Sequence, residues 1–451
     1  MKTTLISLAA ILLSFSLKAQ NVNIPDVNFK TYLVGESSIN TNGDSEIDST
    51  EAAVFNGSID AIYKGIVDLT GIESFTALTK LNCYDNLITR LDLSKNTSRI
   101  ELYCGGNKLT TLDFSKNTAL TILKCSYNPL TSLNISKNAV LDYLDCRFDS
   151  LTSLDVSNNT ALTVLNCADN KLTSLDVSKN TALEWLYFQY NKLTSLDISK
   201  NTALTGLKCS YNKLTSLDLS KNTALDYLDC RYSSLTSLDL SKNTALEWLF
   251  CNNNKLTTLD VFNNTLLDYL GCASNSLTTL DVSNNTVLKS LSCGSNSLTS
   301  LDVSKNKVLD YLVCQSNSLT SLDVSNGNNV NMSEVNLINN PALNCIQVDN
   351  EIWANANWTS FKDAHAFYSN DCKTAGIDDI NIDVASITNY SNIMSINGTV
   401  GTITVFGLLG QLVHQSQLIS GINNIIIDGS GVYLVMVQTV KGIVTKKVYL
   451  N

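Results

Sequence analysis

The chain has 451 residues, with 31 basic and 41 acidic side chains and a formal net charge of −10. This length predicts about three folded units at roughly 150 residues each, and the acid excess excludes the basic surface that nucleic-acid binding requires. Only two histidines are present, which nearly excludes a multi-histidine metal site or a histidine-based proton relay. Because only 16% of the residues are charged, we expect Asn, Ser and Thr to cover much of the surface.

Residues 1–19 have the features of a secretory signal peptide. Lys2 supplies a positive charge, Leu5 to Leu17 form an apolar stretch, and Ala19 precedes a candidate cleavage site. A buried N-terminal helix is the alternative, although the stretch has no polar face. No later run reaches the ~18 apolar residues that cross a bilayer. We therefore expect a chain that is secreted or held at the outer cell surface, with no transmembrane segment after signal cleavage.

Residues 20–78 are expected to form an N-terminal cap with an EF-hand-like loop between two helices. The segment from Asn40 to Glu51 has the spacing of a calcium loop, which takes ligands from positions 1, 3, 5, 7, 9 and 12. The candidate calcium ligands are Asn40, Asn42, Asp44, Glu46, Asp48 and Glu51. Asn40 replaces the usual first Asp and Ser45 replaces the turn glycine. A capped polar turn that binds no metal is the alternative.

Residues 79–343 contain twelve units of 21 residues, and the unit from Leu207 shows their common pattern. The consensus is L-x-C-x-x-N-x-L-T-S-L-D-V-S-K-N-T-A-L-x-x. It resembles the leucine-rich repeat, and similar solenoids occur in internalin-like proteins. The resemblance implies a solenoid of the α+β or β class, in which each coil buries its apolar stripe against its neighbours. The Asn at the sixth position should bond the backbone of adjacent coils, whereas Asp149 and Ser233 replace it in two units.

Two columns of recurring residues, one of cysteine and one of aspartate, run through the repeats. Cysteine fills the third position in eleven units, and Phe188 fills it in the one remaining unit, which favours buried free thiols over a metal or disulfide array. Aspartate follows the third inward leucine in eleven units. We expect each of these aspartates to accept hydrogen bonds from turn N–H groups; a ladder of calcium ions is the alternative.

Aromatic side chains flank the strand leucine in many units, where the leucine-rich repeat pattern implies a concave, solvated face. The candidate ligand-binding residues are Tyr143, Trp185, Tyr187, Tyr227, Trp248, Phe250, Tyr269, Tyr311, Asp226, Glu247 and Asp268. Aromatic rings supply a large, rigid contact area for a protein or a glycan. Cross-strand packing on an ordinary sheet face is the alternative. Five further aromatic residues lie at the strand exits: Tyr127, Phe148, Tyr190, Tyr211 and Tyr232.

One part of the aromatic pattern reflects an internal duplication. The unit that begins at Leu123 and the next unit closely match the stretch that begins at Leu207, 84 residues later. Similar residues in these two stretches are therefore expected to share an origin.

Residues 344–376 are expected to form a C-terminal cap in which Trp353, Trp358 and Phe361 cover the last coil. Cys345 and Cys372 lie outside the repeated cysteine column. In an exported chain this pair predicts a disulfide that closes the cap.

Residues 377–451 alternate Ile and Val with polar residues and predict a small antiparallel β-sandwich. The segments that begin at Val405, Gly431 and Gly442 resemble the C-terminal sorting domain of proteins exported by the type IX secretion system of Bacteroidetes. Asn389-Tyr-Ser-Asn stands in place of the usual Tyr-Pro-Asn-Pro opening. The resemblance implies recognition by the type IX machinery, removal of this domain, and release or attachment to surface glycolipid.

Taken together, these patterns favour a non-enzymatic binding or adhesion protein that recognises a protein or glycan through its concave face. A structural component of a surface layer or matrix is one alternative. A glycosidase with paired carboxylates is another, although an open face lacks the enclosed pocket that perturbs pKa values. No cofactor is expected other than calcium in the N-terminal cap.

Overall fold

A computed structural model describes residues 19–98, 101–372, 386–390, 393–397, 400–407, 409–419, 422–429, 431–439 and 442–450. The chain forms two compact units, one that ends at Asn370 and one that begins at Asp371. Nearly all of the predicted signal peptide, and the predicted start of the C-terminal domain at residue 377, lie outside the described residues.

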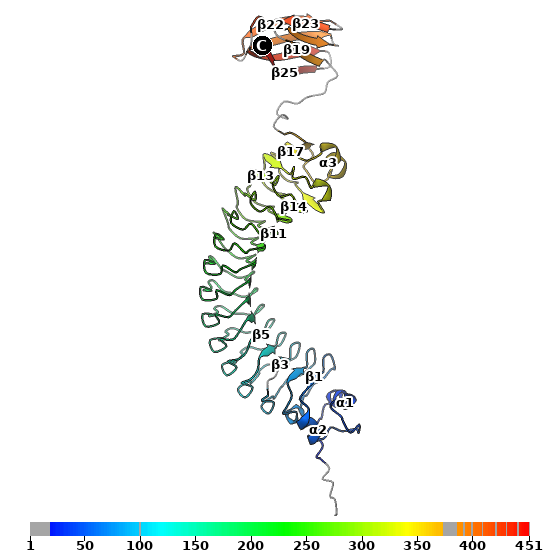
Figure 1. Ribbon diagram of the computed structural model, residues 1–451, viewed down its shortest axis with the longest axis vertical. Coiled ribbons are helices and arrows are strands. Elements are labelled where there is room, and N and C mark those ends of the chain that lie inside the picture. The colour runs from blue at the N-terminus through cyan, green and yellow to red at the C-terminus, as the bar shows by residue number, and fades with distance from the viewer. Residues whose placement is uncertain are drawn as a thin grey trace, which may run out of the picture. The chain divides into compact units, whose positions relative to one another are not determined.

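The first unit is a stack of coils whose short strands form one parallel sheet of fourteen strands. The strands are β1 (Ser58–Asp60), β2 (Lys80–Asn82), β3 (Glu101–Tyr103), β4 (Ile122–Lys124), β5 (Tyr143–Asp145), β6 (Val164–Asn166), β7 (Trp185–Tyr187), β8 (Gly206–Lys208), β9 (Tyr227–Asp229), β10 (Trp248–Phe250), β11 (Tyr269–Gly271), β12 (Ser290–Ser292), β14 (Tyr311–Val313) and β16 (Glu334–Asn336). Figure 1 shows these strands along the inner edge of a curved stack. The predicted leucine-rich repeat solenoid is thus confirmed.

The register of the sheet follows directly from the 21-residue period. Leu207 in β8 pairs with Leu186 and Leu228 in the neighbouring strands, and every such leucine is fully buried. The core therefore consists of continuous rows of identical side chains. Replacing one of these leucines by Ala would leave a cavity that costs about 2–5 kcal/mol.

Parallel pairing also extends beyond the repeats into both predicted caps. In the N-terminal cap, Ile59 of β1 pairs with Leu81 of β2, so the sheet begins one coil before the repeats. Near the other end lies a second parallel sheet of four strands. Its members are β13 (Ser300–Asp302), β15 (Ser321–Asp323), β17 (Cys345–Gln347) and β18 (Phe367–Ser369).

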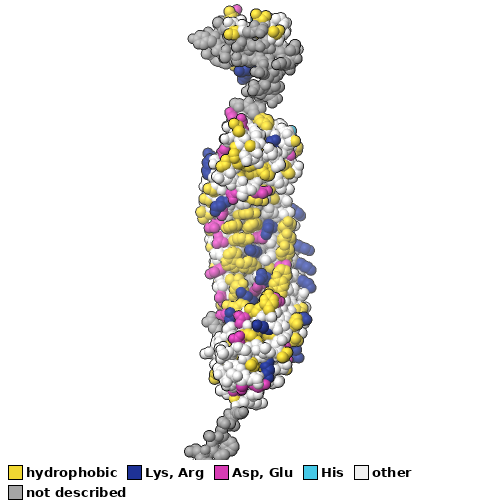
Figure 2. Space-filling model, turned by 90° about the vertical axis from the view of Figure 1, so that its right-hand side faces the viewer, with side chains coloured by type: hydrophobic (Ala, Val, Ile, Leu, Met, Phe, Trp, Pro, Cys, Tyr) yellow, Lys and Arg dark blue, Asp and Glu magenta, His cyan; other side chains and the backbone are white. Residues whose placement is uncertain are grey.

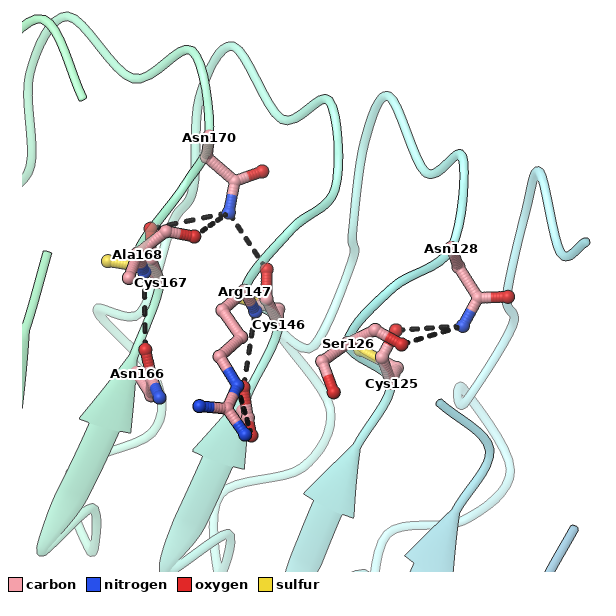
Figure 3. Close-up of polar contacts among 10 residues, drawn as sticks. Cys125, Ser126, Asn128, Cys146, Arg147, Asn166, Cys167, Ala168 and Asn170 are labelled. Atoms are coloured by element: carbon pink, nitrogen blue, oxygen red, sulfur yellow. Dashed lines mark hydrogen bonds and ion pairs between the residues drawn. The ribbon is translucent and has the colours of Figure 1, made fainter. Parts of the chain in front are cut away.

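Asparagine at the sixth position links the coils, as predicted. Nδ2 of Asn212 donates to the carbonyl of Cys209 in its own coil and to that of Phe188 in the preceding coil, at 3.1 and 3.0 Å. Its Oδ1 accepts from the N–H of Leu193 at 3.1 Å. Figure 3 shows the same arrangement, with Nδ2 of Asn170 directed at the carbonyls of Cys146 and Cys167.

A second asparagine ladder, not anticipated from the sequence, runs through the turn on the other side of each coil. Nδ2 of Asn222 donates to the carbonyls of Ile198 and Asn201 at 3.2 and 2.8 Å. The ladder is buried at nearly every step, and its members are Asn96, Asn117, Asn138, Asn159, Asn180, Asn201, Asn222, Asn243, Asn264, Asn285 and Asn306. Each side chain thus satisfies backbone carbonyls that turn away from water.

The cysteine and aspartate columns have the predicted structural roles. Eleven cysteines are free and buried, and Phe188 fills the same row. Burial raises the pKa of the Cys83, Cys167 and Cys293 thiols to about 12. In the aspartate column, Oδ1 of Asp218 accepts from the N–H of Ser220 at 2.9 Å, a bond that holds the pKa of this carboxyl below its usual value.

The caps contain the α-helices that the structure describes in the first unit. In the N-terminal cap these are α1 (Val27–Gly35) and α2 (Ser49–Val54), followed by the short 3₁₀ helix η1 (Ile72–Ser74). A second 3₁₀ helix, η2 (Asn329–Asn331), precedes β16, and α3 (Glu351–Asn357) lies in the C-terminal cap. Trp358 contacts Trp353 and Tyr368 edge-on, and Tyr368 Oη donates to the carbonyl of Trp358 at 2.8 Å. Trp353 and Phe361, which the sequence also assigned to this cap, pack against the buried core that includes Trp358.

The second unit contains two antiparallel sheets. One consists of β19 (Ser386–Tyr390), β20 (Ile393–Asn397) and β23 (Ile422–Ile426), and the other of β22 (Leu412–Leu418), β21 (Gly401–Gly407), β24 (Gly431–Thr439) and β25 (Gly442–Leu450). Val405, Ile425 and Val435 are among the residues of its shared buried core. The sequence predicted a small antiparallel β-sandwich in this part of the chain, and the two antiparallel sheets agree with that prediction.

Candidate functional site

The concave face is formed by the first and third residues of each strand. In β7 the middle residue, Leu186, is fully buried, whereas Trp185 and Tyr187 on either side are partly exposed. All eight aromatic residues predicted to bind a ligand occupy such first or third positions. Figure 2 views this face and shows hydrophobic side chains in rows across the coils, with Lys and Arg among them.

Six of these residues form a continuous cluster, which we call the aromatic strip: Trp185, Tyr187, Tyr227, Trp248, Phe250 and Tyr269. Trp185 stacks on Tyr187 with ring centroids 5.5 Å apart and lies 6.0 Å from Tyr227. Farther along, Phe250 stacks on Tyr269 at 4.4 Å, and Trp248 stacks on Tyr269 at 5.9 Å. Trp248 is the most exposed member, at 40%. Tyr143 and Tyr311 lie on the same face outside this chain of ring contacts.

Gly206 makes room for the Trp185 ring. A Cβ atom at position 206 would lie 2.0 Å from Cε3 of Trp185. The indole therefore lies over the neighbouring strand β8, where any side chain would displace it. Leu207, the next residue of that strand, supplies the buried contact that keeps the strand in register.

Cations lie over several rings of the strip, and the sequence analysis did not single them out. Lys208 Nζ lies 4.9 Å from the Tyr227 ring centroid and 5.5 Å from that of Tyr187. The Arg231 guanidinium lies 5.1 Å from the Phe250 ring centroid. Such contacts attract a cation to the negative face of an aromatic ring. Two features of the sequence could have pointed to these cations. Lys208 stands at the third strand position, and Arg231 directly follows Cys230.

Asp229 orients Arg231 through two hydrogen bonds. Nε and Nη2 of Arg231 donate to Oδ1 and Oδ2 of Asp229, each at 2.9 Å, and only 5% of the Asp229 side chain is exposed. This charge-assisted pair fixes the guanidinium at the edge of the strip. It also raises the pKa of Arg231.

The three predicted acidic residues lie at the strand entrances, beside the aromatic strip. Asp268 forms an ion pair with Lys289 at 3.2 Å. Burial and the neighbouring charge of Glu247 raise the pKa of Asp226. The ion pair with Lys289 therefore offsets one charge of this acidic edge.

A second aromatic row lies at the strand exits. Tyr190, Tyr211 and Tyr232 stack in sequence with centroids 4.2 Å apart at both steps. All three have left-handed backbone conformations, with φ between 50° and 55°. This region disfavours bulky side chains, so stacking between coils compensates for backbone strain.

The predicted calcium loop contains a hydrogen-bonded network around Glu51. Glu51 Oε1 accepts from the N–H groups of Thr41 and Asn42 at 2.8 and 3.0 Å, and its Oε2 accepts from that of Asp48 at 3.0 Å. Asp48 in turn caps α2 and completes a capping box with Glu51. Among the described residues, no three His, Cys, Asp or Glu side chains converge as metal ligands. These contacts favour the capped turn, and calcium binding stays a prediction.

The other predicted ligands of the loop are also engaged in local contacts. Asn40 donates to the carbonyls of Val34 and Asp44, and Asn42 Oδ1 accepts from the N–H of Asp44. Glu46 forms an ion pair with Lys30 at 2.5 Å. Cys345 and Cys372 are not among the free thiols.

No described helix combines the length and the apolarity that a membrane crossing requires. The sequence matches no protein-family model and no curated protein.

Several solved structures share the fold. The functional domain of InlJ from Listeria monocytogenes, described as including a cysteine ladder, has a TM-score of 0.66 and 29% identity, over 96% of this chain and 98% of that chain. The internalin InlF of the same species has a TM-score of 0.60 and 22% identity, over 65% and 90%. A leucine-rich repeat protein of Leptospira interrogans has a TM-score of 0.53 and 19% identity, over 70% and 97%. The structural neighbours are thus internalin-like leucine-rich repeat proteins.

Proposed function

We propose that the chain is a secreted or cell-surface, non-enzymatic binding protein that recognises its partner through the concave face. The aromatic strip carries this proposal. An exposed Trp248, stacked on Tyr269 on a solvated sheet face, provides the rigid apolar area that dominates binding hot spots. The internalin-like fold of the structural neighbours supports a protein partner.

The polar groups of the face support binding rather than catalysis. Asp229 is paired with Arg231 and Asp268 with Lys289, so these two carboxylates of the face already have cationic partners. The strip also lies on an open sheet face, where water has access to the polar groups. These features argue against the glycosidase alternative.

Export is the second part of the proposal. The C-terminal unit has the strands from Val405, Gly431 and Gly442 onward that resemble a type IX sorting domain. If that resemblance reflects function, deletion of residues 377–451 should leave the protein in the periplasm. Normal secretion of the truncated chain would contradict this part alone.

The binding proposal is tested with the full chain and a double variant, Trp185→Ala with Trp248→Ala. Wild-type protein is screened on a glycan array and against purified surface proteins. Each ligand that binds the wild type is then tested with the variant. We expect a loss of at least tenfold in affinity. Phe262→Ala is the matched control, because Phe262 is an exposed aromatic residue outside the strip. Equal binding by the double variant and the control would favour a structural role in a surface layer or matrix.

A further inference from the structure

The concave face carries two copies of one polar cluster, four coils apart. The first consists of Lys124, Tyr143, Asp145 and Arg147. The second consists of Lys208, Tyr227, Asp229 and Arg231, each 84 residues later in the chain. At roughly 4.8 Å between neighbouring strands, four steps place the two clusters about 19 Å apart.

Both clusters pair the same residues, although the contact between Arg231 and Asp229, with two hydrogen bonds of 2.9 Å, is closer than that between Arg147 and Asp145. Lys124 Nζ lies 4.7 Å from the Tyr143 ring centroid, as Lys208 Nζ lies 4.9 Å from that of Tyr227. Arg147 Nε contacts Asp145 Oδ2 at 3.3 Å, and 5% of the Asp145 side chain is exposed, the same fraction as for Asp229. The duplication has therefore preserved the three-dimensional arrangement of the cluster as well as its residues.

Each cluster has hydrogen-bond donors left over for a ligand. A guanidinium has five N–H donors, and Asp229 accepts from two atoms of Arg231. The remaining donors of Arg231 and the ammonium of Lys208 are available on the same face. With one carboxylate and two cations, each cluster carries a net charge of +1, in a chain whose net charge is −10. The charge complement of each cluster is an acidic group.

The two copies differ in their surroundings. Asp169 lies close enough to Arg147 for the two charges to interact, whereas the residue 84 positions later is Asn253. Phe148 and Asp149 in the first copy correspond to Tyr232 and Ser233 in the second. Because the first cluster has an additional acidic neighbour, we expect it to bind an anion more weakly than the second.

The ring contacts favour an acidic protein segment over an acidic polysaccharide. Sugar rings stack on open aromatic faces, but Lys208 covers a face of both Tyr187 and Tyr227, and Tyr269 stacks on Phe250. Aromatic rings interspersed with Arg and Lys are instead typical of protein interfaces, where aromatic residues and Arg are enriched.

We propose that the two clusters bind two acidic side-chain groups of one protein partner, spaced about 19 Å apart along the solenoid axis. This inference rests on the proposed function, since it names the chemistry of the partner at the concave face. Two linked contacts of this kind reinforce one another, because the second forms within an existing complex.

Two blocked peptides of identical composition test the spacing. Glu-Glu-Pro-Pro-Pro-Pro-Glu-Glu holds its acidic pairs about 19 Å apart, at roughly 3.1 Å per residue of polyproline II helix. Pro-Pro-Glu-Glu-Glu-Glu-Pro-Pro has the same charge in one cluster. For the full-length protein at low ionic strength, we expect the spaced peptide to bind at least tenfold more tightly than the clustered peptide. A ratio near one would overturn the proposal.

Variants identify the clusters that produce this preference. Lys124→Gln or Lys208→Gln should each abolish the advantage of the spaced peptide, and Lys208→Gln should weaken binding more. Lys200→Gln is the matched control, with the same charge change at an exposed turn, and should leave the ratio unchanged. Because neither concave lysine has an ion-pair partner among the described residues, their loss should not unfold the chain, which thermal melts verify. Equal effects of the control and of the concave variants would overturn the proposal.

Oligogalacturonate of matched charge tests the polysaccharide alternative. Tighter binding of this glycan than of the spaced peptide would overturn the assignment to a protein partner. Failure of the inference can be told apart from failure of the proposed function. If only the inference fails, the spaced and clustered peptides bind with equal affinity, whereas the variant with Trp185→Ala and Trp248→Ala still loses its partner.

Discussion

Asn128 donates its backbone N–H to Oδ1 of Asp149 at 2.8 Å, at a point where the asparagine ladder is interrupted. Asp149 occupies the ladder position between Asn128 and Asn170, but a carboxylate has no N–H group to donate to the cysteine carbonyls. Its Oδ2 is buried and has no hydrogen-bond partner in the described part of the chain. Burial, together with the charge of Asp145, raises the pKa of Asp149 to about 8.

Asp149→Asn should therefore stabilise the solenoid. The amide restores the missing donor and removes a buried, under-bonded carboxyl, for an expected gain of about 1–3 kcal/mol. Unfolding in denaturant at pH 7 measures the effect. Ser233→Asn is the matched control, because it fills the other gap of the same ladder without removing a carboxyl group. A loss of stability in Asp149→Asn would contradict this account of the gap.

The same carboxyl predicts a pH dependence of stability. Since its pKa is raised on folding, the folded state holds the proton more tightly, and this contribution is fully present below pH ~4. It should be lost progressively as the pH rises from about 4 to about 8. Thermal melts across this window should show the stability advantage of Asp149→Asn over wild type growing as the pH rises. Ser233→Asn should keep the wild-type slope; a parallel slope in Asp149→Asn would contradict the assignment.

The cysteines give a second measurable consequence. Because eleven thiols are buried and their pKa values are raised, Ellman's reagent should not label them in the native protein at pH 8. In denaturant without reductant, eleven cysteines should react, and prior reduction should raise the count to thirteen if Cys345 and Cys372 form the predicted disulfide. Thirteen reactive thiols without reduction would show that this bridge is absent.

The repeated part of the fold could be predicted because one period fixed both the strand register and the inward positions. Leu207 and Cys209 recur every 21 residues, so their stacking follows from the requirement that each coil covers its neighbour. The coil around Ile59 was not anticipated, because Ile and Ala replace the consensus Leu and Cys there. Ile59 pairs with Leu81 because both side chains are buried in the same row, and that row accepts any apolar residue of suitable size.

The candidate site was predicted only in part, for a related reason. Side-chain alternation places Trp185 and Tyr187 on one face, but it does not show which charges lie over the rings. Lys208 contacts Tyr227 from the neighbouring strand, a relationship 19 residues apart in sequence that depends on rotamers. The second asparagine ladder could not be predicted, because Asn222 lies in a polar turn motif that is typical of exposed loops. Its side chain is nevertheless fully buried.

Glu51 offers a test of the N-terminal loop. Its carboxylate accepts hydrogen bonds from Thr41, Asn42 and Asp48, so Glu51→Gln should destabilise the cap by about 1–2 kcal/mol in the presence of EDTA. Under the calcium hypothesis, millimolar calcium would also raise the Tm of the wild type but not that of the variant. If titration calorimetry with calcium detects no heat and the Tm does not change, capping the turn is the only role of Glu51.

Gly206 provides a way to disturb the aromatic strip without removing any aromatic residue. The Cβ of Gly206→Ala would lie 2.0 Å from the indole of Trp185, so the ring must move away from β8 and from its contact with Tyr227. We expect a change in the near-ultraviolet circular dichroism of the stacked rings and a loss of at least tenfold in affinity for any ligand bound by the concave face. Gly294→Ala is the matched control, since its Cβ meets only the flexible end of the Gln315 side chain. Unchanged binding by Gly206→Ala, despite an altered spectrum, would show that the position of Trp185 does not contribute to recognition.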